Sequence, residues 1–305
     1  MSIAKVFVLG ASADQGVPLV AALERSGFAV SAGVRRSDAL EGTPVQHLPA
    51  VAADITDSAS LTRAFTGHDA LAMHLPFEFD RDRAAAFGRN IAVAAAAAGL
   101  QKIVFNTSCF VADHDLELSA HDGRRDIERA LAVTGIPCVF IEPVVFMDNI
   151  IRAWAKPSIV NRGVFAYSAS PALRISWVCL DDVAECMAAA LATNAADGRH
   201  IPVGGAEALV GDEVAERLTE AAGKPIWFES ISPDEFAARM SELVTGSRAV
   251  EPHSIYDGMA KFYRFYNQQP MSPLVVDPAE NRRLLGIEPT PMREWLSRHD
   301  WTNPF

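Results

Sequence analysis

Short apolar runs alternate with helical patterns through the first half of the chain. Residues 3–9 form a compact apolar run that ends at Gly10, and residues 16–26 show helical spacing that Gly27 closes. Further apolar runs occupy residues 28–34, 45–55, 70–75, 102–107 and 138–141, and further helical patterns occupy residues 81–98 and 122–134. This alternation predicts βαβ units and a parallel sheet. Because the strands are continuously apolar, we expect helices on both faces, which is a doubly wound α/β fold.

The regular rhythm breaks after about residue 149. The pattern then predicts a strand at 174–179, a helix at 180–193, a strand at 200–203 and mostly helices beyond Gly204. We therefore expect residues 1–150 to form one domain, to which 174–203 return. Residues 151–173 and 204–305 should form a smaller, mostly helical C-terminal lobe over the carboxyl ends of the sheet.

Two biased segments bear on this picture. The alanine run at 94–98 is interpreted as part of one helix whose small side chains pack close against the sheet. Aromatic residues are frequent in the last third, and Phe262, Tyr263, Phe265 and Tyr266 recur at helical spacing. They either line a pocket for a flat apolar substrate or pack in the core, and core packing is the favoured interpretation.

The composition of the chain bears on which binding partners and which cellular compartment we expect. The 305 residues are 50% hydrophobic and 21% charged, with a formal net charge of −11, which is typical of a globular protein that repels nucleic acid and anionic lipid. No apolar run reaches the roughly 18 residues that span a bilayer. The four cysteines lie mostly in apolar runs without a Cys-x-x-Cys pair, which favours buried thiols in a reducing compartment. We expect a cytoplasmic protein.

The junction after the first predicted strand carries the clearest motif. It reads Gly10-Ala11-Ser12-Ala13-Asp14-Gln15-Gly16 and opens a helix. Glycine at the first position permits a tight turn, and glycine at the last lets the helix start close to the sheet. Unpaired amides at the helix N-terminus then attract an anion. In this strand-turn-helix context the motif predicts a dinucleotide diphosphate site rather than a plain βα turn.

The second predicted strand ends at Arg35 and Arg36, where an acid would favour NADH. Arginine instead accommodates a 2′-phosphate, so the pair predicts NADPH; the alternative is two solvated surface arginines. Asp54 and Ile55 follow the third predicted strand, where adenine would lie, although Asp54 is also typical of a helix N-terminus. The fourth strand ends at three residues expected to border the diphosphate or the nicotinamide ribose: His74, Leu75 and Pro76.

These motifs together resemble the NmrA-like family of atypical short-chain dehydrogenases/reductases. Gly10–Gly16 is similar to that family's Gly-Ala-Thr-Gly-x-x-Gly turn, and Arg35 matches its basic residue after the second strand. Residues 90–108, 135–149 and 178–191 resemble further family segments, including the one that places Pro143 near the cofactor. The resemblance implies a Rossmann-like fold, NADP(H) as cofactor and a variable C-terminal substrate lobe.

The chain also departs from the family pattern. Ala13 replaces the middle glycine, and Glu142 stands where arginine is usual before Pro143. No tyrosine precedes any lysine by four residues, so the Tyr-x-x-x-Lys proton-transfer motif is absent. Arg124 stands where relatives carry lysine or histidine, and it stays protonated. Its expected role is to anchor the nicotinamide amide or a substrate oxyanion.

The remaining catalytic candidates follow the fifth predicted strand. Ser108 is predicted to hydrogen-bond a substrate carbonyl, and His114 or His121 to donate a proton near neutral pH. Each has an ordinary structural alternative, as a turn cap or a loop residue. We predict no metal site, because the histidines are scattered and no His-x-x-x-His or Cys/His cluster occurs.

The function predicted from these residues is NADPH-dependent hydride transfer to a small, aromatic or conjugated carbonyl or quinone. The alternative is a non-catalytic, NADP(H)-binding redox sensor that regulates a protein partner, which the missing Tyr-x-x-x-Lys pair favours. The expected binding partner is a small-molecule substrate. The sequence is also compatible with a homodimer. Neither nucleic acid nor a membrane is expected.

Overall fold

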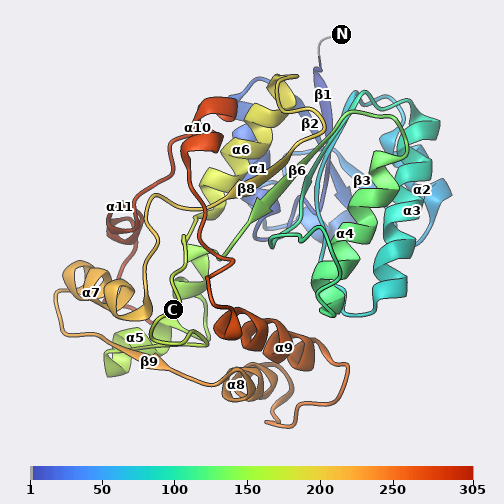
Figure 1. The fold of residues 1–305 in the computed structure, drawn as a ribbon. Coiled ribbons are helices and arrows are strands. Elements are labelled where there is room, and N and C mark those ends of the chain that lie inside the picture. The colour runs from blue at the N-terminus through green and yellow to red at the C-terminus, as the bar shows by residue number, and fades with distance from the viewer. Residues whose placement is uncertain (1–2, 305) are drawn as a thin grey trace. The chain divides into compact units, whose positions relative to one another are not determined.

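A parallel β-sheet organises the N-terminal part of the protein. The computed structural model describes residues 3–304, and within them seven strands pair in the order β3-β2-β1-β4-β5-β6-β8, every neighbouring pair parallel (Figure 1). The strands are β1 (Lys5–Leu9), β2 (Ala29–Val34), β3 (Ala50–Ala52), β4 (Ala70–His74), β5 (Lys102–Asn106), β6 (Cys138–Pro143) and β8 (His200–Val203). The parallel α/β class predicted from the alternation of patterns is confirmed.

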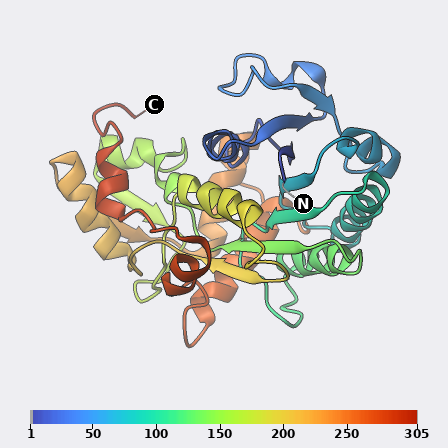
Figure 2. The same cartoon turned by 90° about the horizontal axis from the view of Figure 1, so that it is seen from above.

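Helices cover both faces of this sheet (Figure 2). One face carries α1 and α6, which pack against each other, and the other carries α2, α3 and α4 in a row. Their bounds are α1 (Gly16–Arg25), α2 (Ser58–Phe65), α3 (Arg81–Ala98), α4 (Ser119–Ala132) and α6 (Leu180–Ala192), with α10 (Ala279–Leu285) against α6 and β8. The alanine run lies in α3 as predicted, whereas α2 was not expected from the sequence.

The strand side chains that point toward α2, α3 and α4 form the hydrophobic core on this face of the sheet. Phe7 of β1, Leu71 of β4 and Ile103 of β5 are fully buried in one cluster with the inward side chains of these helices. Small residues let the helices pack closely: a Cβ on Gly88 of α3 would lie 2.8 Å from the Ile127 Cα of α4. Burial of this kind contributes about 25 cal/mol per Å² of apolar surface, so it is the main source of stability here.

The remaining segments form a second compact unit. Its elements are a 3₁₀ turn η2 (Met147–Ile151), α5 (Lys156–Arg162), β7 (Val164–Tyr167), α7 (Gly211–Ala222), β9 (Trp227–Ser230), α8 (Pro233–Thr245), α9 (Ile255–Gln268) and α11 (Met292–Ser297). A two-stranded parallel sheet joins β7 to β9, and neither strand was predicted. Tyr263 and Tyr266 of α9 are buried, and the Tyr263 hydroxyl lies 2.7 Å from that of Tyr167, so these two members of the aromatic stripe pack in the core.

The predicted strand at 174–179 was wrong. Ile175 forms an isolated antiparallel bridge with Leu209, and Val178 forms an isolated parallel bridge with Phe146. The run is apolar because it is buried, but its two ends pair with different segments. It therefore crosses the interior of the second unit without joining a sheet.

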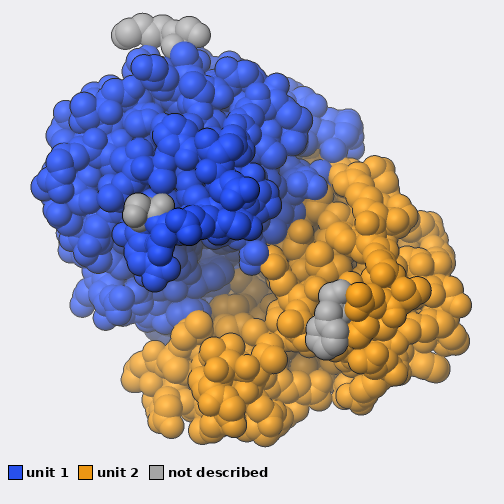
Figure 3. All heavy atoms as spheres, turned by 180° about the vertical axis from the view of Figure 1, so that it is seen from behind, with its two compact units in different colours: residues 1–143, 180–203, 279–288 blue, residues 144–179, 204–278, 289–305 orange. Residues whose placement is uncertain are grey.

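The structure divides into two compact units, coloured separately in Figure 3, and each unit is built from three segments of the chain. The first contains residues 1–143, 180–203 and 279–288, and the second contains residues 144–179, 204–278 and 289–305. Within residues 3–304 no helix is long and apolar enough to cross a membrane. All four cysteines are buried, as their apolar surroundings predicted.

Candidate functional site

The strand order changes direction between β1 and β4, which are neighbours in the sheet. Ligands of doubly wound folds bind in the crevice that such a reversal opens at the carboxyl ends of the strands. Gly10 directly follows β1 and His74 ends β4, and the His74 Nε2 lies 3.0 Å from the Gly10 carbonyl oxygen. Burial lowers the pKa of His74, so the neutral imidazole donates this hydrogen bond and holds the turn.

The turn after β1 is compact. The Ala13 amide donates to the Gly10 oxygen at 3.1 Å, and the Gly16 amide donates to the Ala13 oxygen at 2.8 Å. Gly10 has a φ of +89°, and a Cβ there would lie 2.7 Å from the His74 Nε2; a Cβ on Gly16 would lie 2.1 Å from the Gly10 oxygen. Both glycines are therefore required sterically.

The first turn of α1 has no side-chain cap, since its N-cap residue Gln15 makes no capping hydrogen bond. The Gly16 and Val17 amides both donate to the Ala13 oxygen, at 2.8 and 3.0 Å, and Pro18 has no N–H. The start of α1 therefore attracts an anion through the helix dipole rather than through free amides. The turn and the start of α1 thus have the shape and polarity that fit a dinucleotide diphosphate.

A cavity of about 670 Å³ opens beside this turn. It is lined by the predicted residues Gly10, Ser12, Ala13, Arg35, Arg36, Ile55, His74, Leu75 and Pro76. It is also lined by residues that were not predicted, namely Leu9, Gly33, Val34, Ala39 and Ala53. Leu9, Val34 and Ala53 each adjoin a predicted residue at a strand end, and Gly33 lies two residues before Arg35. The ends of the predicted strands are therefore the signal that could have found these four, but not Ala39.

Five predicted cofactor residues do not line this cavity. Asp14, Gln15 and Gly16 belong to the turn and the start of α1, and Pro143 is the buried last residue of β6. Asp54 is exposed, and its Oδ1 accepts hydrogen bonds from the amide and the hydroxyl of Thr56, at 2.8 and 2.7 Å. These bonds from Thr56 lower the pKa of Asp54, so its main visible role is to cap the turn before α2.

The two arginines after β2 differ in their surroundings. Arg36 Nε donates to Asp38 Oδ1 at 3.1 Å, whereas Arg35 forms no ion pair within residues 3–304. Both are exposed and line the cavity. Arg35 is therefore the guanidinium that an incoming phosphate meets without displacing a partner.

A hydrogen-bond network ties the end of β5 to the start of α1. Asn106 Nδ2 donates to Gln15 Oε1 at 2.8 Å, and Gln15 Nε2 donates to Ser108 Oγ at 3.0 Å. The Ser108 amide donates to Asn106 Oδ1 at 2.8 Å and stabilises a φ of +61°, a left-handed conformation that non-glycine residues rarely adopt. Ser108 is thus held in a fixed orientation.

Arg124 is buried, and its guanidinium donates hydrogen bonds to two backbone carbonyl oxygens. Its Nη2 donates to the Leu75 oxygen at 2.6 Å and to the Pro76 oxygen at 2.9 Å, and its charge lies over the Phe77 ring at 5.1 Å. Leu75 and Pro76 line the cavity. The visible role of Arg124 is therefore to position the chain after β4, and its Nε has no hydrogen-bond partner among residues 3–304.

The two candidate histidines lie in opposite environments. Burial, together with the charge of Arg124 three residues later on α4, lowers the pKa of His121 to about 3. Its imidazole is neutral at pH 7, which disagrees with the expectation that it donates a proton near neutral pH. His114 is exposed, with Nδ1 2.6 Å from Asp113 Oδ1. Ser108, His121 and Arg124 are buried whereas His114 is exposed, so the four catalytic candidates do not share one environment.

Comparison with known proteins agrees with this geometry. The model of the NmrA-like family matches residues 3–296. The chain is 31% identical over 249 residues to the (4-alkanoyl-5-oxo-2,5-dihydrofuran-3-yl)methyl phosphate reductase of Streptomyces griseus, covering 80% of each protein. It is 25% identical over 259 residues to the NAD(P)H azoreductase of Xenophilus azovorans, covering 85% of this chain and 86% of that one.

A solved structure shares the fold. The NADPH-dependent quinone oxidoreductase of Escherichia coli, in complex with NADPH, superimposes with a TM-score of 0.79 at 24% identity, over 96% of this chain and 99% of that chain. The resemblance inferred from the glycine-rich turn and the later segments is confirmed by the family match. This chain belongs to the NmrA-like family.

Proposed function

We propose that this protein is an NADPH-dependent reductase of small, conjugated or aromatic carbonyl and quinone-type compounds. The observation that carries the proposal is the cavity at the switch between β1 and β4. The glycine-rich turn before α1 borders it at Gly10, Ser12 and Ala13, and Arg35, which has no ion pair within residues 3–304, lines it after β2. These two features recognise a diphosphate and a 2′-phosphate, respectively.

Each group around the cavity has a distinct task in this proposal. The glycine-rich turn and the positive end of the α1 dipole bind the diphosphate, Arg35 pairs with the 2′-phosphate, and Ile55 offers an apolar contact to the adenine. When bound, NADPH would supply the hydride, and the chain would orient it and exclude water. His74 and Arg124 act as positioning residues, since they fix the turn and the segment after β4.

Ser108 is the side chain that we propose to hydrogen-bond the substrate oxygen. It follows β5, and Asn106 fixes its backbone. Its hydroxyl accepts from Gln15 Nε2 at 3.0 Å and donates to Gln15 Oε1 at 3.1 Å, so a substrate oxygen would replace Gln15 Oε1 as the acceptor. A fixed donor reduces the reorganisation that accompanies charge development on the oxygen. No tyrosine–lysine pair is required for hydride transfer itself, and a proton from solvent or from exposed His114 would complete the reduction.

The substrate class follows from relatives as well as from residues. The two similar enzymes reduce, by their names, a butenolide phosphate and azo compounds, which share a conjugated acceptor. We extend that class, and NAD(P)H dependence, to this chain. We also propose a cytoplasmic location, where NADPH is available and buried thiols stay reduced, and we retain a homodimer as the expected assembly.

The test is a titration with NADPH and NADH, followed by turnover on quinones, enones and aryl ketones. A charged hydrogen bond to phosphate contributes about 1.5–3 kcal/mol, so Arg35→Ala should weaken NADPH binding about ten- to a hundredfold and leave NADH binding nearly unchanged. Arg36→Ala is the matched control, because Arg36 lines the same cavity but is already paired with Asp38; its effect should be smaller.

The outcomes separate the alternatives. Equal loss of both cofactors in Arg35→Ala would remove Arg35 from the 2′-phosphate site. Tight NADPH binding without turnover on any compound of the panel would contradict the reductase and favour the redox-sensing regulator. Absence of binding to either cofactor would refute both, and the cavity would then have another ligand.

A further inference from the structure

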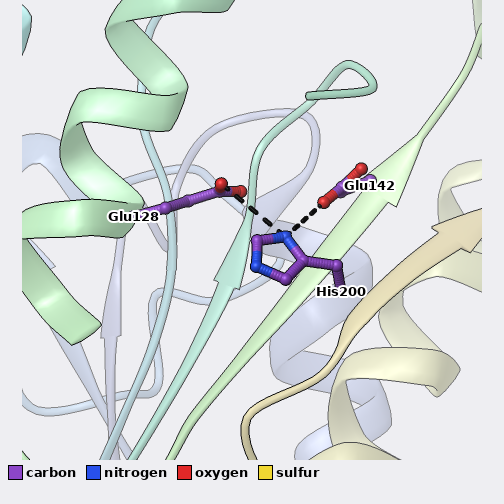
Figure 4. A group of neighbouring side chains, drawn as sticks. All are labelled: Glu128, Glu142 and His200. Atoms are coloured by element: carbon purple, nitrogen blue, oxygen red, sulfur yellow. Dashed lines mark hydrogen bonds and ion pairs between the residues drawn. The ribbon is translucent and has the colours of Figure 1, made fainter. Parts of the chain in front are cut away.

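Three side chains outside the cofactor cavity meet in the first unit. Glu128 comes from α4, Glu142 from β6 and His200 from β8 (Figure 4). Their ligating atoms all lie within 4.8 Å of one another. His200 Nδ1 is 2.8 Å from Glu142 Oε1 and 3.7 Å from Glu128 Oε2. None of the three residues lines the cavity beside Gly10.

The two carboxylates are buried and incompletely satisfied. The side chains of Glu128 and Glu142 are only 4% and 5% exposed. Glu142 Oε2 accepts a hydrogen bond from the Val111 amide at 3.2 Å, but Glu128 Oε1 has no hydrogen-bond partner within residues 3–304. A buried acceptor that forms no hydrogen bond costs about 1–3 kcal/mol of stability, and a charged one costs more. Figure 4 shows the Glu128 carboxylate directed toward the His200 ring.

The nearby arginines do not neutralise this pair of carboxylates. Arg124 donates to the backbone oxygens of Leu75 and Pro76, and Arg125 pairs with Asp115. Neither forms an ion pair with Glu128 in the part of the chain that the structure describes. Among residues 3–304 the group that pairs with these two carboxylates is therefore His200 itself. A metal ion would take over this pairing and displace the protons that the cluster otherwise holds, as it does when it binds imidazole and carboxylate ligands.

The donor set indicates which cation would suit the site. An imidazole nitrogen with two carboxylate oxygens is a combination that Zn²⁺ and its first-row neighbours accept, whereas Mg²⁺ and Ca²⁺ prefer oxygen ligands alone. The His200 side chain is 53% exposed, so an ion has access from solvent and further ligand positions remain for water. The Phe140 ring, 4.7 Å from the His200 ring, restrains the orientation of the imidazole.

We propose that Glu128, Glu142 and His200 form a binding site for one divalent transition-metal cation of the zinc class. The site depends on Glu142, which stands where the family usually has arginine. An arginine there would place a positive charge beside His200 and repel a metal ion, whereas glutamate supplies a carboxylate ligand. The site is separate from the cofactor cavity, so the proposal does not depend on the reductase activity.

The test is a titration of chelator-treated protein with Co²⁺, followed by its visible d–d absorption, and with Zn²⁺, followed by calorimetry. We expect one equivalent per chain, with the spectrum of a nitrogen- and oxygen-ligated ion. Zn²⁺ should also raise the unfolding temperature, because an ion that binds only the folded state stabilises it by mass action. Failure of the wild-type protein to bind either ion at millimolar concentration would overturn the proposal.

Variants assign the ion to these three residues. Glu128→Gln and His200→Gln should each weaken binding at least about tenfold. The matched control is His47→Gln: His47 is 55% exposed and lies 2.8 Å from a single carboxylate of Glu24, so this variant should bind like wild type. Circular dichroism verifies the fold of each variant. Unchanged Co²⁺ affinity in a folded His200→Gln variant, or an equal loss in His47→Gln, would place the ion elsewhere and refute the site.

Discussion

The burial of His121 predicts a specific acid sensitivity of folding. His121 is 2% exposed and packs against the Phe110 ring at a centroid distance of 5.3 Å. Burial, reinforced by the charge of Arg124, lowers its pKa from 6.5 to about 3 in the folded protein. Below about pH 6.5 the unfolded chain therefore takes up a proton that the folded chain refuses, and stability is lost as the pH falls toward 3.

The size of this effect follows from the two pKa values. One unit of pKa difference corresponds to about 1.4 kcal/mol, so lowering the pH from about 7.5 to about 5 should cost the folded state about 2 kcal/mol through His121 alone. His74, whose pKa is also lowered by burial, adds a loss of the same sign. The contribution of His121 is therefore measured as a difference between wild type and a variant.

Urea unfolding followed by circular dichroism at both pH values gives the comparison. His121→Gln should lose about 2 kcal/mol less than wild type between about pH 7.5 and about pH 5, whatever its absolute stability. His114→Gln, at a position whose side chain is 72% exposed, is the control and should respond like wild type. If His121→Gln lost as much as wild type, His121 would not be a buried neutral imidazole, and its exclusion as a proton donor would fail.

Two further substitutions test the turn and the core. Gly10→Ala should cost about 1–2 kcal/mol of stability, because Gly10 has a left-handed backbone conformation. It should also weaken NADPH binding, because the new methyl group would displace the His74 ring, which lies 2.7 Å from the Cβ position. Full NADPH affinity in a calorimetric titration would contradict the role of this turn in cofactor binding. Leu71→Ala, at a fully buried position of β4, should lower the free energy of unfolding by about 3–5 kcal/mol. Leu243→Ala, at a residue that is 55% exposed, should change it by less than about 0.5 kcal/mol in the same urea experiment.

The sequence located the elements whose pattern is local. Helix α3 was predicted from its alanine-rich pattern at about residues 81–98, and it spans Arg81–Ala98. In the structure Asp80 caps its start and Gly99 ends it in a left-handed conformation, so adjacent residues set both ends. The glycine-rich turn was predicted because its strand, tight turn and helix follow one another within about a dozen residues. The strand-end position of Arg35 followed from the same local periodicity.

Other features depend on which segments meet in space. Strands β7 and β9 pair across about sixty residues of intervening chain, and each has only four residues, too few for periodicity to identify. The apolar run at 174–179 read as one strand, although its two ends bridge to different partners. A hydrophobic pattern shows that a segment is buried, but it does not show which other segment of the chain that segment pairs with.

The chemistry of individual side chains divides in the same way. The sequence alone determined a parallel α/β fold, a glycine-rich turn after β1 and an arginine after β2, since each is encoded by adjacent residues. Only the tertiary structure decided that His121 is neutral, because burial and the charge of Arg124 set its pKa. It alone also gathered Glu128, Glu142 and His200, which come from three different elements. The burial of a side chain and the charges near it depend on residues that are distant in sequence, so its pKa and its neighbours follow only from the folded structure.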